Sequence, residues 1–310
     1  MTAPKYPVYV ISKGRWGAEA LTARFLISDG VDFRLVVEPQ EVDEYVKTFG
    51  RDRLLVLPFS NLGLGSVPAR NWCWEHAIDA GHERHWILDD NILKIERRWK
   101  TVRIACDSGP AFRACEMFVD RYENISVAGM NYHMFAMDGR KAPPFFLNCH
   151  VYSCLLIKND IQQRWRGRYN EDTDLCLQVL SAGQCTVLIN AFLAYKMVTM
   201  TMKGGNATEL YKGDGRLKMA RSLERVWPGV VETKRRFQRP QHVVKDAWKR
   251  FDTPLILKPG VVCDPDAKPN EYGMELVQVK PIKSAALREF VKDKLVVREP
   301  VELREDQSEF

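Results

Sequence analysis

The stretch His85-Trp86-Ile87-Leu88-Asp89-Asp90-Asn91 decides the fold that we expect for this chain. Its apolar residues are typical of a strand buried in a sheet, and two acids and an amide follow at once. A strand that ends in this way brings carboxylates to the edge of an open α/β sheet, where ligands bind. Two adjacent carboxylates repel each other unless a cation or solvent screens them. The alternative is a strand followed by a helix-capping Asp, and the acid pair alone leaves both interpretations open.

The residues before this stretch predict alternating strands and helices. We expect strands at residues 6–12, 33–37 and 54–57, each followed by a segment with helical spacing of apolar residues. Right-handed crossovers then bring the loop Ser12 to Arg15 next to Asp89 to Asn91. The predicted fold class is therefore α/β, with a mostly parallel mixed sheet flanked by helices.

Later segments complete this prediction. Further strands are expected at residues 92–98, 125–130, 150–157, 184–190 and 192–199, with helices near 109–122 and 216–226 and a long loop over 131–146. From residue 234 the chain is rich in Lys and Arg. We therefore predict a main domain over residues 1–233 and a basic, helical C-terminal extension over 234–310, with a flexible tail.

Composition limits the class of protein. The chain has 310 residues, 45% of them hydrophobic, and a net charge of +6, which permits a polyanionic partner without requiring one. Its 8 cysteines include no Cys-x-x-Cys pair, so reduced thiols and a cytosol-like compartment are expected. No apolar run reaches the roughly 20 residues of a membrane span. A dinucleotide fingerprint and a P-loop lysine motif are both missing from the sequence.

Two other groups of residues are candidates for a nucleotide site. Lys13 and Arg15 follow the first strand and suit phosphate or uracil edges, although exposed loop bases are the alternative. Ser66 and Arg70 lie in the first turns of a predicted helix, where free backbone N–H groups favour anions. Ser66 as a simple cap and Arg70 as a solvated side chain are the alternatives.

The second informative stretch is Asn170-Glu171-Asp172-Thr173-Asp174. Acids in a first helical turn are favoured by the helix dipole, so capping alone explains part of the pattern. Four acid or amide groups within five residues, beside the Arg-rich turn 166–168, are more than a cap requires. This stretch is the candidate for acceptor chemistry.

Together these stretches resemble the GT-A class of nucleotide-sugar glycosyltransferases. More closely, Tyr9 to Arg15, the Asp-Asp-Asn stretch, Asn170-Glu171-Asp172, Lys203-Gly204-Gly205-Asn206 and Arg239-Pro240-Gln241-His242 resemble the phage glycosyltransferases associated with ten-eleven-translocation-type dioxygenases. The resemblance covers about the first 250 residues. It implies a hexosyltransferase in the bacterial host cytoplasm that moves a sugar from a UDP-sugar to 5-hydroxymethylcytosine in double-stranded phage DNA.

The resemblance also implies roles for individual residues. Asp90 and Asn91 bind Mg²⁺ or Mn²⁺, with Asn91 standing where the family motif has Asp, and Asp172 is the base with Glu171 in reserve. The residues expected to hold the nucleotide sugar are Ser12, Lys13, Arg15, Ser66, Arg70, Asp89, Asp90 and Lys203. The residues expected to contact DNA are Arg166, Arg168, Arg235, Arg236 and Arg239.

A DNA acceptor requires the enzyme to reach into the major groove or to extrude the base onto an aromatic surface. Tyr132, His133, Phe135 and Trp165 are the candidates for stacking, and packing in the core is the alternative for each. Two other functions stay open: a glycosyltransferase with a non-DNA acceptor, and a non-catalytic nucleic-acid binding module. The basic residues 234–250 would form the nucleic-acid surface of such a module, and a solvated amphipathic helix is the alternative interpretation of this segment.

Overall fold

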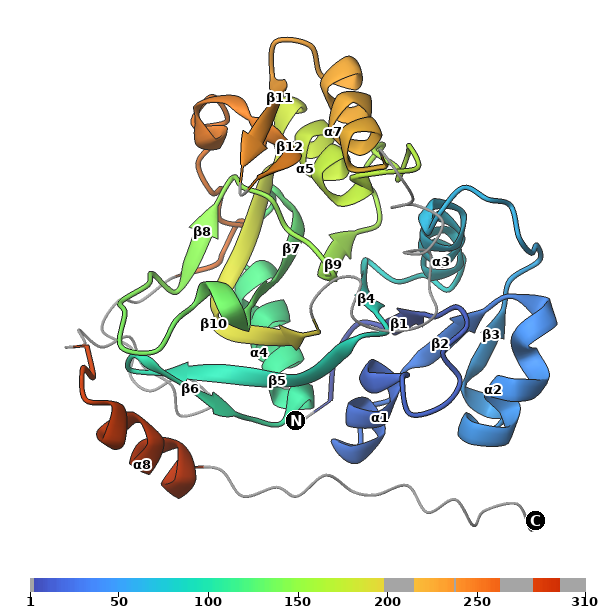
Figure 1. Ribbon diagram of the computed structural model, residues 1–310, viewed down its shortest axis with the longest axis horizontal. Coiled ribbons are helices and arrows are strands. Elements are labelled where there is room, and N and C mark those ends of the chain that lie inside the picture. Colours follow the sequence, from blue (N-terminus) through green and yellow to red (C-terminus); the bar gives the residue numbers. More distant parts are fainter. Residues whose placement is uncertain (1–2, 198–214, 237, 263–280, 296–310) are drawn as a thin grey trace.

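A computed structural model describes residues 3–197, 215–236, 238–262 and 281–295 of the chain (Figure 1). Its centre is a large mixed sheet, with strands in the order β3-β2-β1-β4-β9-β7-β10-β5-β6 and β8 paired to β10. The predicted α/β fold with a mixed sheet and flanking helices is confirmed.

The first half of the sheet is parallel. Strands β1 (Val8–Ile11), β2 (Arg34–Val37), β3 (Leu54–Val56) and β4 (Arg84–Asp89) pair in parallel, as the alternation of strands and helices predicts. The helices between them are α1 (Leu21–Ser28), α2 (Val42–Phe49) and α3 (Val67–Asp79), with 3-10 turns η1 (Pro39–Glu41) and η2 (Arg51–Arg53). The carboxyl ends of β1 and β4 therefore lie side by side.

The second half contains most of the antiparallel pairs, and only β7 and β10 pair in parallel there. Its strands are β5 (Ile92–Trp99), β6 (Val102–Ala105), β7 (Ile125–Tyr132), β8 (Phe145–Leu147), β9 (Cys154–Lys158) and β10 (Cys185–Lys196). Its helices are α4 (Ser108–Val119) and α5 (Glu171–Ser181), and η3 (His133–Phe135) starts the predicted long loop. Among the described residues, the two strands expected over 184–190 and 192–199 form the single strand β10, whose pairing with β7 shifts register between Ile189 and Leu193. Residues 198 and 199 lie outside the described residues.

Helices cover both faces of the sheet. Trp86 and Leu88 of β4 pack with α1, α2 and α4, whereas Ile87 packs with α3 and α5 on the other face. All three side chains are fully buried. A strand covered on both faces needs apolar residues at every position, which explains the unbroken apolar run before Asp89.

The basic segment after residue 230 differs from its prediction. Helix α7 (Gly215–Val226) forms as expected, but β11 (Val231–Arg236) and β12 (Arg239–Val244) make an antiparallel hairpin, followed by η4 (Lys245–Trp248). The helical prediction for 234–250 is wrong because paired Val231 and Val244 bury the hairpin against α5 and α7. Helix α8 (Ala285–Leu295) agrees with the expected helix in the C-terminal extension.

The predicted division at residues 233 and 234 falls inside β11, and the two-domain organisation stays a prediction. The cysteines in the described ranges form no disulfide, as predicted. No helix in the described ranges is long and apolar enough to cross a membrane.

Candidate functional site

A cleft of about 390 Å³ lies at the carboxyl ends of β1 and β4. It is bounded by the loop after β1, the start of α3, the Asp-Asp-Asn stretch and the start of α5, four segments that are far apart in the sequence. Of the predicted site residues, the following line it: Ser12, Lys13, Arg15, Ser66, Arg70, Asp89, Asp90, Asn91, Arg168, Glu171 and Asp172. The parallel topology explains this convergence, because it brings the first and fourth strand ends to one edge.

Asp90 is buried at the floor of the cleft and is fully engaged by side chains of β1 and its loop. Its Oδ1 forms an ion pair with the guanidinium of Arg15, and Ser12 Oγ donates to its Oδ2 at 2.8 Å. Ser12 is held in turn by the Tyr45 hydroxyl at 2.7 Å. Burial raises the pKa of Asp90, and the charge of Arg15 opposes that rise.

Asp89 binds two cations, one at each carboxylate oxygen. Arg70 Nη2 donates to Oδ1 at 2.8 Å, while Lys196 Nζ and Ser153 Oγ both donate to Oδ2 at 2.7 Å. Burial alone would raise the pKa of Asp89, but Lys196 and Arg70 outweigh it and lower the pKa to about 2. Lys196, at the end of β10, was missed from the sequence. The available signal was an apolar strand that ends in a charged residue, as β4 does.

The described residues around the Asp-Asp pair do not fit a metal ion as they are arranged. Both oxygens of Asp89 and both of Asp90 already have hydrogen-bond or ion-pair partners. Within the described ranges, no three His, Cys, Asp or Glu side chains are grouped as metal ligands. Asn91 Oδ1 is buried with no partner among these residues, and it is the one oxygen of the stretch that is available. Metal binding at Asp90 and Asn91 stays a prediction.

Arg70 is the cation best placed to receive an anion. Its side chain is 5% exposed and lies 4.6 Å from the buried ring of Trp165. Its Nη1 is buried and has no hydrogen-bond partner among the described residues. A buried N–H group without a partner costs free energy that a bound anion recovers.

The start of α5 supplies two acids with different surroundings. Asn170 precedes the helix in a left-handed conformation, and its side chain donates to the Met219 carbonyl of α7 at 2.7 Å. Glu171 accepts from Ser66 Oγ at 2.9 Å and lies 3.7 Å from Arg70 Nε. Asp172 Oδ2 lies 3.3 Å from His150 Nε2.

These surroundings separate the pKa values of the two acids. Burial and the neighbouring Asp172 charge raise the pKa of Glu171, although Arg70 opposes this. For Asp172, burial is outweighed by His150 and by the Thr173 N–H, so its pKa is held below the usual range. The ionised form is therefore favoured more strongly at Asp172 than at Glu171.

Two histidines meet beside Asp172. Thr173 Oγ1 lies 3.2 Å from His150 Nε2 and 3.3 Å from His242 Nε2. His242 comes from β12, so the C-terminal hairpin contributes to the site. Burial and the neighbouring His150 lower the pKa of His242. His150 was missed as a site residue because its position in the loop before β9 has no motif of its own.

The predicted DNA-binding residues fall into two groups. Arg166 forms two hydrogen bonds with Asp174, at 2.8 and 3.0 Å, and Arg168 lines the cleft. Arg235, Arg236 and Arg239 are exposed on the hairpin. Lys203, predicted to contact the donor, lies outside the described residues.

The predicted stacking residues do not form one surface: Tyr132 and Phe135 are stacked with ring centroids 5.9 Å apart, whereas Trp165 packs elsewhere. Trp165 is buried under Arg70, and the Tyr132 hydroxyl contacts Lys196 at 3.2 Å. His133 contacts Glu96 at 3.2 Å, whereas Phe135 is 62% exposed. Trp165 therefore packs in the core, which was the alternative to base stacking for this residue.

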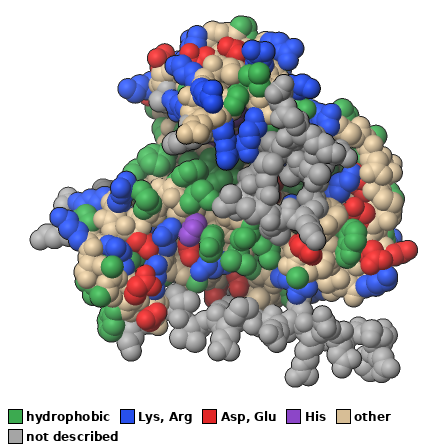
Figure 2. All heavy atoms as spheres, in the orientation of Figure 1, with side chains coloured by type: hydrophobic (Ala, Val, Ile, Leu, Met, Phe, Trp, Pro, Cys, Tyr) green, Lys and Arg blue, Asp and Glu red, His purple; other side chains and the backbone are tan. Residues whose placement is uncertain are grey.

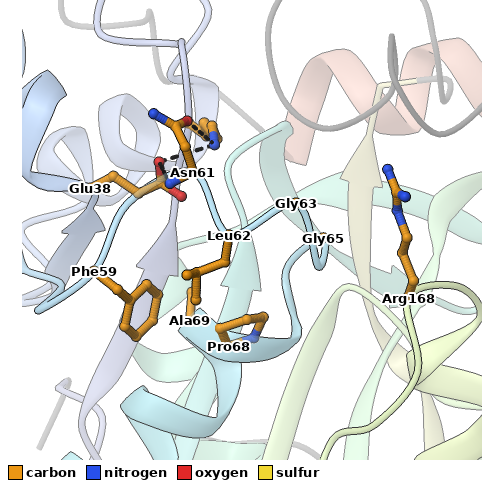
Figure 3. A pocket seen from close by; sticks show the side chains of 10 residues that line it. Glu38, Phe59, Asn61, Leu62, Gly63, Gly65, Pro68, Ala69 and Arg168 are labelled. Carbon is orange, nitrogen blue, oxygen red and sulfur yellow. Dashed lines mark hydrogen bonds and ion pairs between the residues drawn. The ribbon is translucent and has the colours of Figure 1, made fainter.

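A smaller pocket of about 110 Å³ adjoins the cleft (Figure 3). Phe59 and Pro68 lie on one side of it and Arg168 on the other. Lys13 Nζ lies 3.0 Å from a Glu38 carboxylate oxygen and 3.0 Å from Asn61 Oδ1. Lys13, Glu38 and Arg168 line both this pocket and the cleft, so the two spaces are contiguous.

Comparison with known families identifies the chain. The family model of TET-associated glycosyltransferases matches residues 6–205, which include the large central sheet and most of the residues that line the cleft. The chain belongs to the TET-associated glycosyltransferase family. This glycosyltransferase therefore has the activity class implied by the resemblance of its Asp-Asp-Asn and Asn-Glu-Asp stretches.

Two other comparisons add little to this assignment. No curated protein matches the chain. A solved structure of a putative nucleotide-diphospho-sugar transferase from Desulfovibrio desulfuricans G20 is similar with a TM-score of 0.32 and 11% identity. That match covers 57% of this glycosyltransferase and 77% of the other chain.

Proposed function

We propose that this glycosyltransferase moves a hexose from a UDP-sugar to the hydroxyl of 5-hydroxymethylcytosine in double-stranded phage DNA. One observation carries the proposal. A single cleft joins an edge lined by Arg15, Arg70 and Lys196, suited to a diphosphate, to the carboxylate of Asp172, which can accept the proton of a hydroxyl.

The donor end stabilises the departing diphosphate. Arg15, Arg70 and Lys196 line the cleft, and the acids beneath them fix their positions. Preorganised cations aimed at developing negative charge lower the barrier to bond breaking. The adjoining pocket beside Phe59 suits the uracil ring, with Lys13 and Arg168 at its mouth. Metal assistance through Asp90 and Asn91 was predicted from the sequence, and no step of this proposal depends on it.

The acceptor end removes a proton. The acceptor oxygen attacks the anomeric carbon, the bond from that carbon to the diphosphate oxygen breaks, and the hydroxyl proton passes to Asp172. Asp172 lines the cleft and is held by its contact with His150 Nε2 at 3.3 Å, and a carboxylate positioned in this way can act as the general base. One displacement of this kind inverts the anomeric centre. Glu171 instead holds Ser66 and lies near Arg70, so its role is to position the donor end.

The hairpin supports a nucleic-acid acceptor. Lys and Arg side chains gather over the upper part of the molecule in Figure 2, where Figure 1 has β11, β12 and α7. Arg235, Arg236 and Arg239 are exposed there. Such a surface attracts the phosphate backbone independently of sequence.

The test is incubation of hydroxymethylated duplex DNA with a panel of UDP-sugars, followed by mass spectrometry of the nucleosides. A mass increase of one hexose on hydroxymethylcytosine is expected, and an Asp172→Asn variant should abolish it. Hydrolysis of a UDP-sugar without modified DNA would favour a non-DNA acceptor. DNA binding without any response to nucleotide sugars would favour the non-catalytic module.

A further inference from the structure

A second cavity, of about 360 Å³, lies between the hairpin and the start of α5. It shares His150, Thr173 and His242 with the donor cleft, so it opens onto the acceptor end next to Asp172. The other residues that line it are Glu232, Lys234, Arg236, Val243, Val244, Lys245, Asp246 and Trp248. Its size falls in the range of small-molecule sites, about 300–1,000 Å³.

One wall of this cavity is aromatic. The rings of Trp248 and His150 are stacked, with centroids 6.2 Å apart and an angle of 15° between their planes. The backbone of Trp248 has a φ of 72°, in the left-handed region that bulky residues rarely adopt. Packing against Phe251 and a hydrogen bond from the Phe251 N–H to the Trp248 carbonyl at 3.0 Å hold this conformation.

The rim of the cavity carries three cations and two acids. Residues 232, 234 and 236 alternate along β11, so Glu232, Lys234 and Arg236 share one face of the hairpin. His242, which is paired with Thr233, lines the cavity from the other face. Lys234 is paired with Glu232, and Lys245 adds another cation. Arg235 belongs to the opposite face of β11, as does Thr233, whose hydroxyl contacts Glu224 of α7 at 2.7 Å.

The cavity therefore combines an aromatic wall, a rim on which Arg236 and Lys245 add cations, and a connection to the carboxylate of Asp172. Base stacking on an aromatic ring and phosphate contacts from flanking cations are what an unpaired nucleotide requires. The contact from His150 Nε2 to Asp172 Oδ2 links the wall directly to the acid that accepts the proton.

We propose that this cavity receives the target pyrimidine after it has been extruded from the duplex, with the base stacked on Trp248. We call it the base pocket. Arg236 and Lys234 hold the phosphates beside the extruded nucleotide, and the hydroxymethyl group points toward Asp172. The inference rests on the proposed function and adds the residues that hold the acceptor.

The test compares duplexes in which hydroxymethylcytosine faces guanine with duplexes in which it faces adenine. A mismatched base is easier to extrude, so kcat/KM should rise about 10-fold or more for the wild-type enzyme on the mismatch. Trp248→Leu should lower kcat/KM on the matched duplex by about 10- to 100-fold, and Trp248→Phe by less, because a smaller ring still stacks. Trp99→Leu, at the distant end of β5, should have no effect.

The possible outcomes separate the base pocket from the function it depends on. If DNA is glycosylated but neither the mismatch nor Trp248→Leu changes kcat/KM, the base pocket is wrong and the proposed function stands. If no DNA is glycosylated although a UDP-sugar raises the melting temperature, both proposals fail at the acceptor. A Trp248→Leu variant whose melting temperature no longer rises with the UDP-sugar has misfolded. In that case the comparison of matched and mismatched duplexes with the wild-type enzyme decides whether the base pocket is correct.

Discussion

The two ends of the cleft hold their charges in different ways. At the donor end, Asp89 and Asp90 are paired with Arg15, Arg70 and Lys196 by direct contacts. At the acceptor end, Asp172 faces histidines, and the cations of the neighbouring hairpin are exposed. The donor end is therefore assembled before any ligand binds, whereas the acceptor end leaves its cations available to an incoming polyanion.

This difference teaches that paired acids at a strand end do not by themselves indicate a metal. The electrostatic requirement for a cation next to Asp89 and Asp90 holds, because unscreened neighbouring carboxylates repel each other. Side chains from three other segments meet that requirement here. Substitutions at the donor end should therefore weaken both donor binding and the stability of the fold. Substitutions at the acceptor end should lower only the rate of sugar transfer.

The largest expected effect is at the acceptor end. Asp172→Asn should lower kcat by about 10²- to 10⁴-fold, because a positioned base contributes that much to proton transfer. The KM for the UDP-sugar should stay close to that of the wild type, because an interaction made only in the transition state lowers kcat without changing substrate binding. Glu171→Gln is the comparison variant and should instead raise that KM. Initial-rate kinetics check both, and an equal loss in the two variants would contradict separate roles.

The donor end should respond next most strongly. Arg70→Met removes a buried cation with an unpartnered N–H, and it should lower kcat/KM for the donor by about 10²- to 10³-fold. The matched control is Arg51→Met, an exposed arginine in η2, which should leave kcat/KM unchanged. Isothermal titration with UDP checks the binding part. Unchanged UDP affinity in Arg70→Met would remove this arginine from the donor site.

Stability should depend on pH through the donor-end acid. The pKa of folded Asp89 is about 2, below its ordinary 3.8, so its stabilisation is complete above pH 4 and is lost as the pH falls toward 2. At about 1.4 kcal/mol per pKa unit, the wild type should lose about 2–3 kcal/mol of unfolding free energy from this group. Lys196→Met should lose less over the same window. Urea unfolding of both proteins at pH 5 and near pH 2 measures their free energies of unfolding. If the difference in unfolding free energy between the wild type and Lys196→Met is the same at both pH values, Lys196 does not stabilise the ionised form of Asp89.

The hairpin should show a smaller, salt-dependent effect. Arg236→Ala, on the face toward the second cavity, should reduce the slope of log affinity against log salt by about 1, since one phosphate contact is lost. Arg235→Ala removes the same charge from the opposite face and should reduce the slope by less. Fluorescence anisotropy at several salt concentrations measures this difference. Equal slopes in the two variants would mean that DNA does not enter on the cavity side.

Metal removal should have the smallest effect. The carboxylate oxygens of Asp89 and Asp90 already have partners. The rate of transfer after chelation of divalent ions should therefore stay within about tenfold of the untreated rate. A metal ion that acted as a Lewis acid would supply several kcal/mol, and its removal would slow transfer by more than that. Rates in chelator with and without added Mn²⁺ measure this. A complete loss that Mn²⁺ restores would establish the predicted metal site at Asp90 and Asn91.

The sequence by itself determined the parallel half of the sheet and most of the cleft. An apolar run covered on both faces, followed by acids, specifies where β4 ends, and right-handed crossovers bring Ser12 and Arg15 to the same edge. These are local patterns combined with a general topological rule. The start of α5 was found in the same way, since acids before an apolar helical repeat are visible without a structure.

Only the tertiary structure decided which charges meet. Lys196 lies 107 residues from Asp89 along the chain, and His242 lies 69 residues from Thr173. Neither contact follows from a periodic pattern, because strand pairing between distant segments depends on the whole sheet. The hairpin was mistaken for a helix for the same reason: burial of Val231 and Val244 against α5 and α7 selects the strand pair, and that partner surface exists only in the folded chain.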